Sequence, residues 1–170
     1  MKNQEVLRPA SWKHDRDLFI TQAGIIAALY VVLTVLFAQF AFKEVQIRIS
    51  EMLTILPFFF PAAIPGLFLG CLVGNILGGA VLPDVVFGSL ATLIGAIGTY
   101  LLRKTKFVFT LPPVIANAVI VPFVLRYAYG VGDAHWFLVV TVGIGELISV
   151  CILGMILKVA LWKRRRFIFD

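Results

Sequence analysis

A carboxylate and a carboxamide occur where the chain is otherwise apolar. Glu146 lies within the run VGIGELISVCIL, and Asn117 lies within LPPVIANAVIVPF. A charged side chain in the hydrocarbon of a bilayer costs about 3 kcal/mol unless it finds a partner, so such residues usually mark a ligand or proton site. A carboxylate accepts hydrogen bonds, and an amide both donates and accepts them. The pair therefore marks a candidate site for a polar ligand or a proton.

Other polar side chains lie inside or at the edges of the apolar runs. They are Gln22, Gln39, Arg48, Glu51, Asn75, Asp84 and Arg126. Glu146 and Asn117 both fall about ten residues from the outer ends of their expected helices, roughly 15 Å deep at 1.5 Å per residue. No basic residue is expected at that depth. The sequence predicts a cavity between them that opens outward and has Arg48, Glu51 and Asp84 around its mouth.

Several of these residues also have structural explanations. Arg48 and Glu51 stand three apart and can pair at the membrane interface, while Asp84 follows a proline where a carboxylate can cap a helix. Asn75 can bond across a helix pair.

Polar residues deeper in the membrane and aromatic residues at its surface also have structural explanations. Asn117 can satisfy helix backbone or a neighbouring side chain, and Glu146 can form an ion pair without a ligand. Tyr127 and Trp136 can anchor the chain at the membrane interface or stack on a flat ligand.

Composition indicates that a membrane holds these residues in place. The 170 residues are 61% hydrophobic and only 14% charged, whereas soluble domains carry about 25% charged residues. Segments near 20 apolar residues can cross a bilayer. The pattern predicts an all-α membrane protein whose six helices are expected at 18–41, 49–60, 64–79, 84–102, 111–127 and 136–162.

Basic residues predict the orientation of these helices. A six-helix arrangement leaves only Lys43, Arg48 and Arg126 of the 15 basic residues on one side. Positive residues concentrate on the cytoplasmic side, so both termini are expected there. We expect residues 1–17 to be a cytoplasmic segment without a cleaved signal, 18–162 to form the membrane domain, and 163–170 to form a basic tail.

Small residues recur at helix spacing in two of the expected helices. Gly66, Gly70, Gly74 and Gly78 are four apart, as are Ala23 and Ala27, with Gly24 and Ala28 one position on. Such stripes let helix backbones approach closely. The glycine stripe is expected to pack against helix 84–102. On spacing alone, the alanine pair fits ordinary packing within the chain.

Several function classes lack their sequence signatures. The chain has no GxxxxGK[ST], HExxH or GxSxG motif, so no catalytic or ATP-hydrolysing apparatus and no cofactor is expected. Cys71 and Cys151 lack metal-type spacing. The net charge of +6 resides in short clusters at helix ends, which argues against nucleic acid as a partner.

Four blocks in the same order resemble the QueT family. They are VQIRISEMLTILPFFFPAAIPGLFLGCLVGNILGG, DVVFGSLATLIGA, LPPVIANAVIVPF and VGIGELI. The resemblance runs from about residue 18 to 160. It implies the fold of an S component of an energy-coupling factor (ECF) transporter, a multi-pass protein of the bacterial plasma membrane that takes up queuosine precursors. It also implies partners, a transmembrane T component and two ABC-type ATPases, with Ala23 and Ala27 matching the family's docking motif on helix 1.

A 7-deazaguanine ligand fits the polar residues as a hypothesis. Glu146 accepts its N–H groups, Asn117 donates to its carbonyl, and Glu51 or Asp84 neutralises an aminomethyl substituent. Two other classes remain open. A stand-alone secondary transporter would use Glu146 to carry a proton, and an assembly subunit would bind no small molecule; an intramembrane enzyme lacks a visible nucleophile or metal set.

Overall fold

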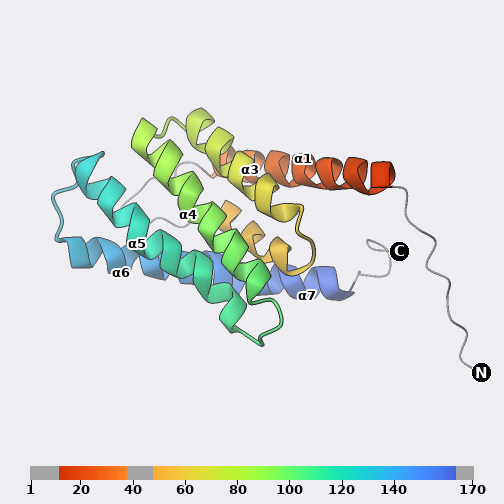
Figure 1. The fold of residues 1–170 in the computed structure, drawn as a ribbon. Coiled ribbons are helices and arrows are strands. Elements are labelled where there is room, and N and C mark those ends of the chain that lie inside the picture. The colour runs from red at the N-terminus through yellow and green to blue at the C-terminus, as the bar shows by residue number, and fades with distance from the viewer. Residues whose placement is uncertain (1–11, 38–47, 164–170) are drawn as a thin grey trace, which may run out of the picture.

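The computed structural model describes residues 12–37 and 48–163, and these residues form an all-helical bundle (Figure 1). In chain order the elements are α1 Trp12–Leu36, the 3-10 helix η1 Ile49–Phe58, α3 Ala63–Leu77, α4 Leu82–Leu101, the 3-10 turn η2 Val108–Thr110, α5 Leu111–Tyr127, α6 His135–Glu146, the π-helix η3 Leu147–Gly154 and α7 Met155–Lys163. The predicted all-α class is confirmed. Gln39, the predicted end of the first helix at 41 and most of the tail 163–170 lie outside the described residues.

Four helical segments within the described ranges are long and apolar enough to cross a membrane. They are Arg16–Leu36, Leu82–Leu101, Val108–Tyr127 and the continuous segment His135–Lys163. Two shorter apolar helices, Ile49–Phe58 and Ala63–Leu77, accompany them. The count of six spans and the orientation of the termini therefore stay predictions. The first helix begins at Trp12, six residues before its expected start at 18.

The second helix differs from the expected α-helix 49–60. Residues Ile49–Phe58 form a 3-10 helix that contains Pro57. A 3-10 helix rises about 2.0 Å per residue, so ten residues extend roughly 20 Å. The segment contacts α1, α3, α4, η3 and α7, and it runs through the middle of the bundle (Figure 1). Its central position explains why seven of its residues are buried.

The glycine stripe of α3 packs against α1 rather than α4, which corrects the predicted partner. A Cβ at residue 70 would lie 2.7 Å from the Cβ of Tyr30, and one at residue 66 would lie 2.7 Å from the carbonyl oxygen of Ala23. Thr34 faces Gly74 in the same way. Residues 23, 27, 30 and 34 of α1 thus form one face that fits into the stripe. Glycines 95 and 98 of α4 face the prolines that begin α5.

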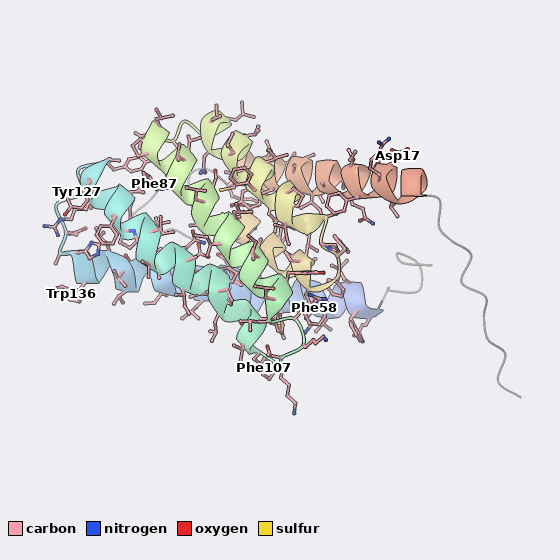
Figure 2. All side chains as sticks on the ribbon, viewed as in Figure 1. Asp17, Phe58, Phe87, Phe107, Tyr127 and Trp136 are labelled. Atoms are coloured by element: carbon pink, nitrogen blue, oxygen red, sulfur yellow. The ribbon has the colours of Figure 1, made fainter. Side chains whose placement is uncertain are left out.

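The outer surface of the bundle is apolar, as a membrane requires. Large hydrophobic side chains on α1, α4, α5 and α6 point outward (Figure 2). The apolar core instead gathers around η1, with Ile55, Leu67 and Phe109 fully buried. Buried polar side chains lie next to this apolar core.

We predict that Gly70→Ala destabilises the protein by about 1–3 kcal/mol, because the added methyl group forces α1 and α3 apart. The measurement is thermal or chemical unfolding in detergent. Gly24→Ala is the matched control: a Cβ there meets nothing within 4 Å, so helix propensity should leave stability equal or slightly higher. Equal losses in the two variants would contradict this packing.

Candidate ligand-binding site

Polar side chains form a buried cluster at the centre of the bundle, here called the polar centre. Each is at most 3% exposed. Its members are Arg48, Glu51, Asn75, Asp84, Thr92, Asn117 and Glu146. Buried polar groups cost free energy unless they are hydrogen-bonded, and buried charges need a partner. The contacts of each side chain therefore indicate which groups serve structure and which remain available.

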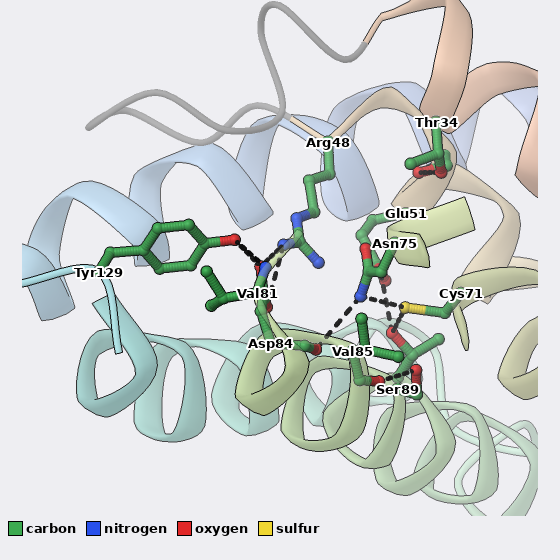
Figure 3. A network of polar contacts seen from close by, with 12 residues as sticks. Thr34, Arg48, Glu51, Cys71, Asn75, Val81, Asp84, Val85, Ser89 and Tyr129 are labelled. Carbon is green, nitrogen blue, oxygen red and sulfur yellow. Dashed lines mark hydrogen bonds and ion pairs between the residues drawn. The ribbon is translucent and has the colours of Figure 1, made fainter. Parts of the chain in front are cut away.

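Arg48 and Asp84 form a buried ion pair. The Arg48 Nη2 lies 3.2 Å from Oδ2 and 3.4 Å from Oδ1 of Asp84 (Figure 3). Arg48 directly precedes η1, and Asp84 lies in the first turn of α4 without making a side-chain cap. The two structural alternatives, an Arg48–Glu51 pair and helix capping by Asp84, are therefore wrong. Both residues are buried rather than placed around an exposed mouth.

Tyr129, in the link between α5 and α6, forms a hydrogen bond with the carboxylate of this ion pair. Its hydroxyl donates to Asp84 Oδ2 at 3.0 Å and accepts from the Val81 amide at 3.3 Å (Figure 3). Partial burial and the Asp84 carboxylate raise the pKa of Tyr129 to about 12. The phenol therefore stays protonated, and a hydrogen-bond donor, at any physiological pH.

Glu51 is held through one of its two oxygens. Tyr30 donates a short hydrogen bond to Oε1, and the Thr92 hydroxyl donates to the same oxygen at 3.0 Å. Oε2 is buried and has no hydrogen-bond partner among the described residues. Tyr30 was missed by sequence reasoning, although it shares a helix face with Ala23 and Ala27 at spacings of seven and three.

Asn75 links α3 to α4, which agrees with the alternative that it bonds across a helix pair. Its Nδ2 donates to the Asp84 carbonyl oxygen at 3.3 Å and lies 3.6 Å from Cys71 Sγ (Figure 3). Gly88 makes room for this arrangement, because a Cβ there would lie 2.9 Å from Asp84 Oδ1. These contacts give Asn75 a positioning role next to the ion pair.

Glu146 and Asn117 come together from α6 and α5. The Asn117 amide lies beside the carboxylate, and both Glu51 and Arg48 are close enough to act on Glu146 electrostatically. An arginine is therefore near enough to influence Glu146, although whether it lies at matching depth in the membrane stays a prediction. Glu146 Oε2 and Asn117 Nδ2 are nevertheless buried without hydrogen-bond partners in the described ranges 12–37 and 48–163. The predicted cavity between them stays a prediction.

A change of helix type coincides with Glu146. The residue ends α6, and the next eight residues form the π-helix η3. A π-segment rotates the side chains that follow it, and such segments occur frequently at functional sites. Ser149, within η3, is another buried side chain whose hydroxyl lacks a partner in the described chain.

The structure does not bring Tyr127 and Trp136 into the polar centre. They are 77% and 69% exposed at one end of the bundle (Figure 2). Tyr127 stacks on Phe123 and lines an apolar groove of ≈ 440 Å³ between α4 and α5. These positions favour their alternative role as interface anchors.

The polar centre gathers hydrogen-bond donors and acceptors from several helices. Three carboxyl groups, one guanidinium and two amides converge there, and no cluster of metal-ligating side chains occurs in the part of the chain that the structure describes. Among the described residues, the buried atoms without a hydrogen-bond partner include two carboxylate oxygens, Glu51 Oε2 and Glu146 Oε2, and one amide nitrogen, Asn117 Nδ2. A ligand that offers N–H donors beside one acceptor would satisfy them.

An apolar exterior around a buried polar cluster is typical of a helical membrane protein. The family model described as QueT transporter matches residues 20–163, and the chain belongs to this family. This is a family of transporters, not of enzymes.

One curated relative is the protein named queuosine precursor transporter QueT from Lactococcus lactis subsp. cremoris (strain MG1363). It is 34% identical over 84 residues, which cover 48% of this chain and 49% of the relative. The match thus spans about half the length of that protein. No solved structure matches the chain.

We predict that Asp84→Asn destabilises the fold by about 3–5 kcal/mol, because it leaves the Arg48 charge buried without its ion pair. Unfolding in detergent measures the loss. Asp133→Asn, in the α5–α6 link, is the matched control and should change stability little. The double variant Arg48→Met/Asp84→Leu should recover much of the lost stability, because it leaves no unpaired charge. If Asp84→Asn is as stable as Asp133→Asn, the ion pair has no structural role.

Proposed function

We propose that this protein is the substrate-binding S component of an ECF transporter that imports a queuosine precursor of the 7-deazaguanine class. Membership of the QueT transporter family and the name of the Lactococcus relative support the cargo. The observation that carries the proposal is the pairing of Glu146 and Asn117, two buried side chains with hydrogen-bonding atoms left over.

The ligand's chemistry matches these leftover atoms. A 7-deazaguanine presents N–H donors and a neighbouring carbonyl on one edge of a flat ring. Glu146 Oε2 accepts from the N–H groups, and Asn117 Nδ2 donates to the carbonyl. A site built on buried polar atoms rejects analogues that leave those atoms unpaired.

The remaining charged residues divide between structure and binding. Asp84 is occupied by Arg48 and Tyr129, so it is a poor partner for a cationic substituent. Glu51 keeps Oε2 free and is the better counter-ion for an aminomethyl group. Asn75 positions the ion pair. The positive charge of Arg48 reduces the electrostatic repulsion between Glu51 and Glu146.

The energy for import comes from partners, since the chain has no nucleotide-binding motif. We propose docking through α1 onto a transmembrane T component that two ABC-type ATPases drive. Ala23 and Ala27 are half-buried against α3, whereas Gly24 and Ala28 are exposed. The docking register therefore shifts by one residue, to the Gly24–Ala28 pair.

In this proposal the chain crosses the bacterial plasma membrane six times, with both termini in the cytoplasm. The short helices η1 and α3 are then the second and third crossings. The apolar exterior of the bundle supports this location.

A second function has one observation in its favour. Glu51 and Glu146 interact electrostatically within the polar centre, and neighbouring carboxyl groups readily share a proton. A stand-alone proton-coupled transporter would use that pair. It predicts pH-dependent uptake by this chain alone in proteoliposomes, whereas the S-component proposal predicts none without the T component and ATPases.

Glu146→Gln should weaken ligand binding by roughly 10- to 100-fold or more, because each hydrogen bond to a charged group contributes about 1.5–3 kcal/mol. Purified protein is titrated with queuine, its aminomethyl and cyano precursors, and guanine. Asp133→Asn, the same chemical change outside the polar centre, should bind as wild type. Unchanged affinity in Glu146→Gln removes Glu146 from the site, and no binding by wild type favours a non-binding assembly subunit.

Gly24→Leu should abolish copurification with the T component while leaving folding and ligand binding intact. The leucine projects from the exposed face of α1, where a Cβ meets nothing within 4 Å. Ile94→Phe, which enlarges an exposed side chain on α4, is the control and should preserve the complex. A complex that forms normally with Gly24→Leu would place the docking surface elsewhere.

A further inference from the structure

A pocket opens on the surface near the C-terminal end of the last long helix. Its volume is ≈ 380 Å³. It is lined by Phe58, Met155, Lys158, Val159, Trp162 and Lys163. Phe58 comes from the end of η1, and the other five come from α7. The pocket is remote from the polar centre and takes no part in the function proposed above.

Lys158 places a positive charge in this pocket. Its ammonium lies 3.9 Å from the ring centroid of Phe58 and 4.2 Å from that of Phe109, so it rests on two aromatic faces. Within the described ranges it forms neither an ion pair with a carboxylate nor a hydrogen bond. An ammonium carries three donors, and aromatic faces leave some of them available. The pocket therefore offers a partly desolvated cation to an anion.

The surroundings of the pocket are basic. The link from α4 to α5 brings Arg103, Lys104 and Lys106 to the end of the bundle where Phe109 meets Phe58. Asp17, one of two aspartates in the first turns of α1, is engaged by Arg16 at 3.6 Å. Electrostatics at this end thus favour a negatively charged ligand.

The lining also selects an amphiphilic ligand. Val159 and Trp162 are 50% and 49% exposed, and Ile152 and Ile156 continue the apolar surface along the same helix. Tryptophan is typical of the boundary between hydrocarbon and headgroups. A free anion would gain nothing from this apolar wall, whereas a phospholipid would place its headgroup on the ammonium and its acyl chains along the wall.

We propose that the pocket around Lys158 binds the phosphate headgroup of an anionic phospholipid. Lys158 and Lys163 contact the phosphate, and Trp162 packs against the glycerol region. Basic pockets beside membrane helices are known to hold anionic lipid headgroups. The bound lipid supplies the counter-charge that Lys158 lacks within the described chain.

The test compares wild type with Lys158→Gln and Lys106→Gln in neutral detergent. Each variant removes one lysine from the basic end, but only Lys158 lines the pocket. Phosphatidylglycerol, phosphatidylcholine with identical acyl chains and inorganic phosphate are added separately. Thermal unfolding gives the shift in midpoint, and native mass spectrometry counts bound lipids.

Phosphatidylglycerol should raise the unfolding midpoint of wild type and Lys106→Gln and remain bound to both. Lys158→Gln should need at least tenfold more phosphatidylglycerol to reach half of the shift in unfolding midpoint. Lys158→Arg should retain most of that shift. Phosphatidylcholine and inorganic phosphate should have little effect.

Four outcomes would overturn the proposal. They are no difference between Lys158→Gln and wild type, an equal effect of phosphatidylcholine, the same shift with inorganic phosphate alone, and a loss in Lys106→Gln as large as in Lys158→Gln. If Lys158→Gln does not fold, Trp162→Ala is used instead. This variant removes one side chain that lines the pocket and keeps the Lys158 charge, so it should also weaken the effect of phosphatidylglycerol. An unchanged lipid effect in Trp162→Ala would equally reject the site.

Discussion

The buried ion pair between Arg48 and Asp84 organises the centre of the bundle. Placing a guanidinium in an apolar interior is costly unless a carboxylate and further hydrogen bonds accompany it. Asp84 meets this need and is itself fixed by Tyr129. One ion pair thereby connects the start of η1, the start of α4 and the link after α5. Of the three carboxyl groups in the polar centre, it neutralises one.

The remaining two carboxyl groups give the polar centre its chemical preference. Glu51 and Glu146 interact with each other and share the influence of a single arginine that is already paired. An excess of acceptors in a dry interior is satisfied by protons or by a ligand rich in N–H groups. Asn117 adds one donor beside them. In the proposed site, this combination would be more specific than negative charge alone, because the ligand would also have to carry an acceptor.

Hydrophobic runs were sufficient to predict the helices but not their type. Apolar length predicted α3, α4, α5 and the last long helix to within about two residues at most ends. The 3-10 form of η1 and the π form of η3 depend on what surrounds them in three dimensions, since periodicity in a uniformly apolar run cannot distinguish helix types. Those two irregular segments begin beside Arg48 and Glu146, where local geometry matters most.

The residues of the polar centre were predicted better than their pairings. A polar side chain in an apolar run is conspicuous, which is why Glu146, Asn117, Glu51 and Asp84 stood out. Their partners lie far away in sequence: Arg48 meets Asp84 across 36 positions, and Thr92 meets Glu51 across 41. A tyrosine in a membrane helix can serve either as an apolar packing residue or as a hydrogen-bond donor. The sequence therefore did not single out Tyr30. The glycine stripe likewise revealed close packing without revealing that α1 was the partner.

The central helix η1 connects the polar centre to the pocket around Lys158. Glu51 near its start belongs to the polar centre, and Phe58 at its end lies under the Lys158 ammonium. Seven residues of 3-10 helix separate them by roughly 14 Å. This short segment is packed on several sides by α1, α3, α4, η3 and α7. The same buried element therefore fixes the position of Glu51 in the polar centre and of Phe58 under the Lys158 ammonium.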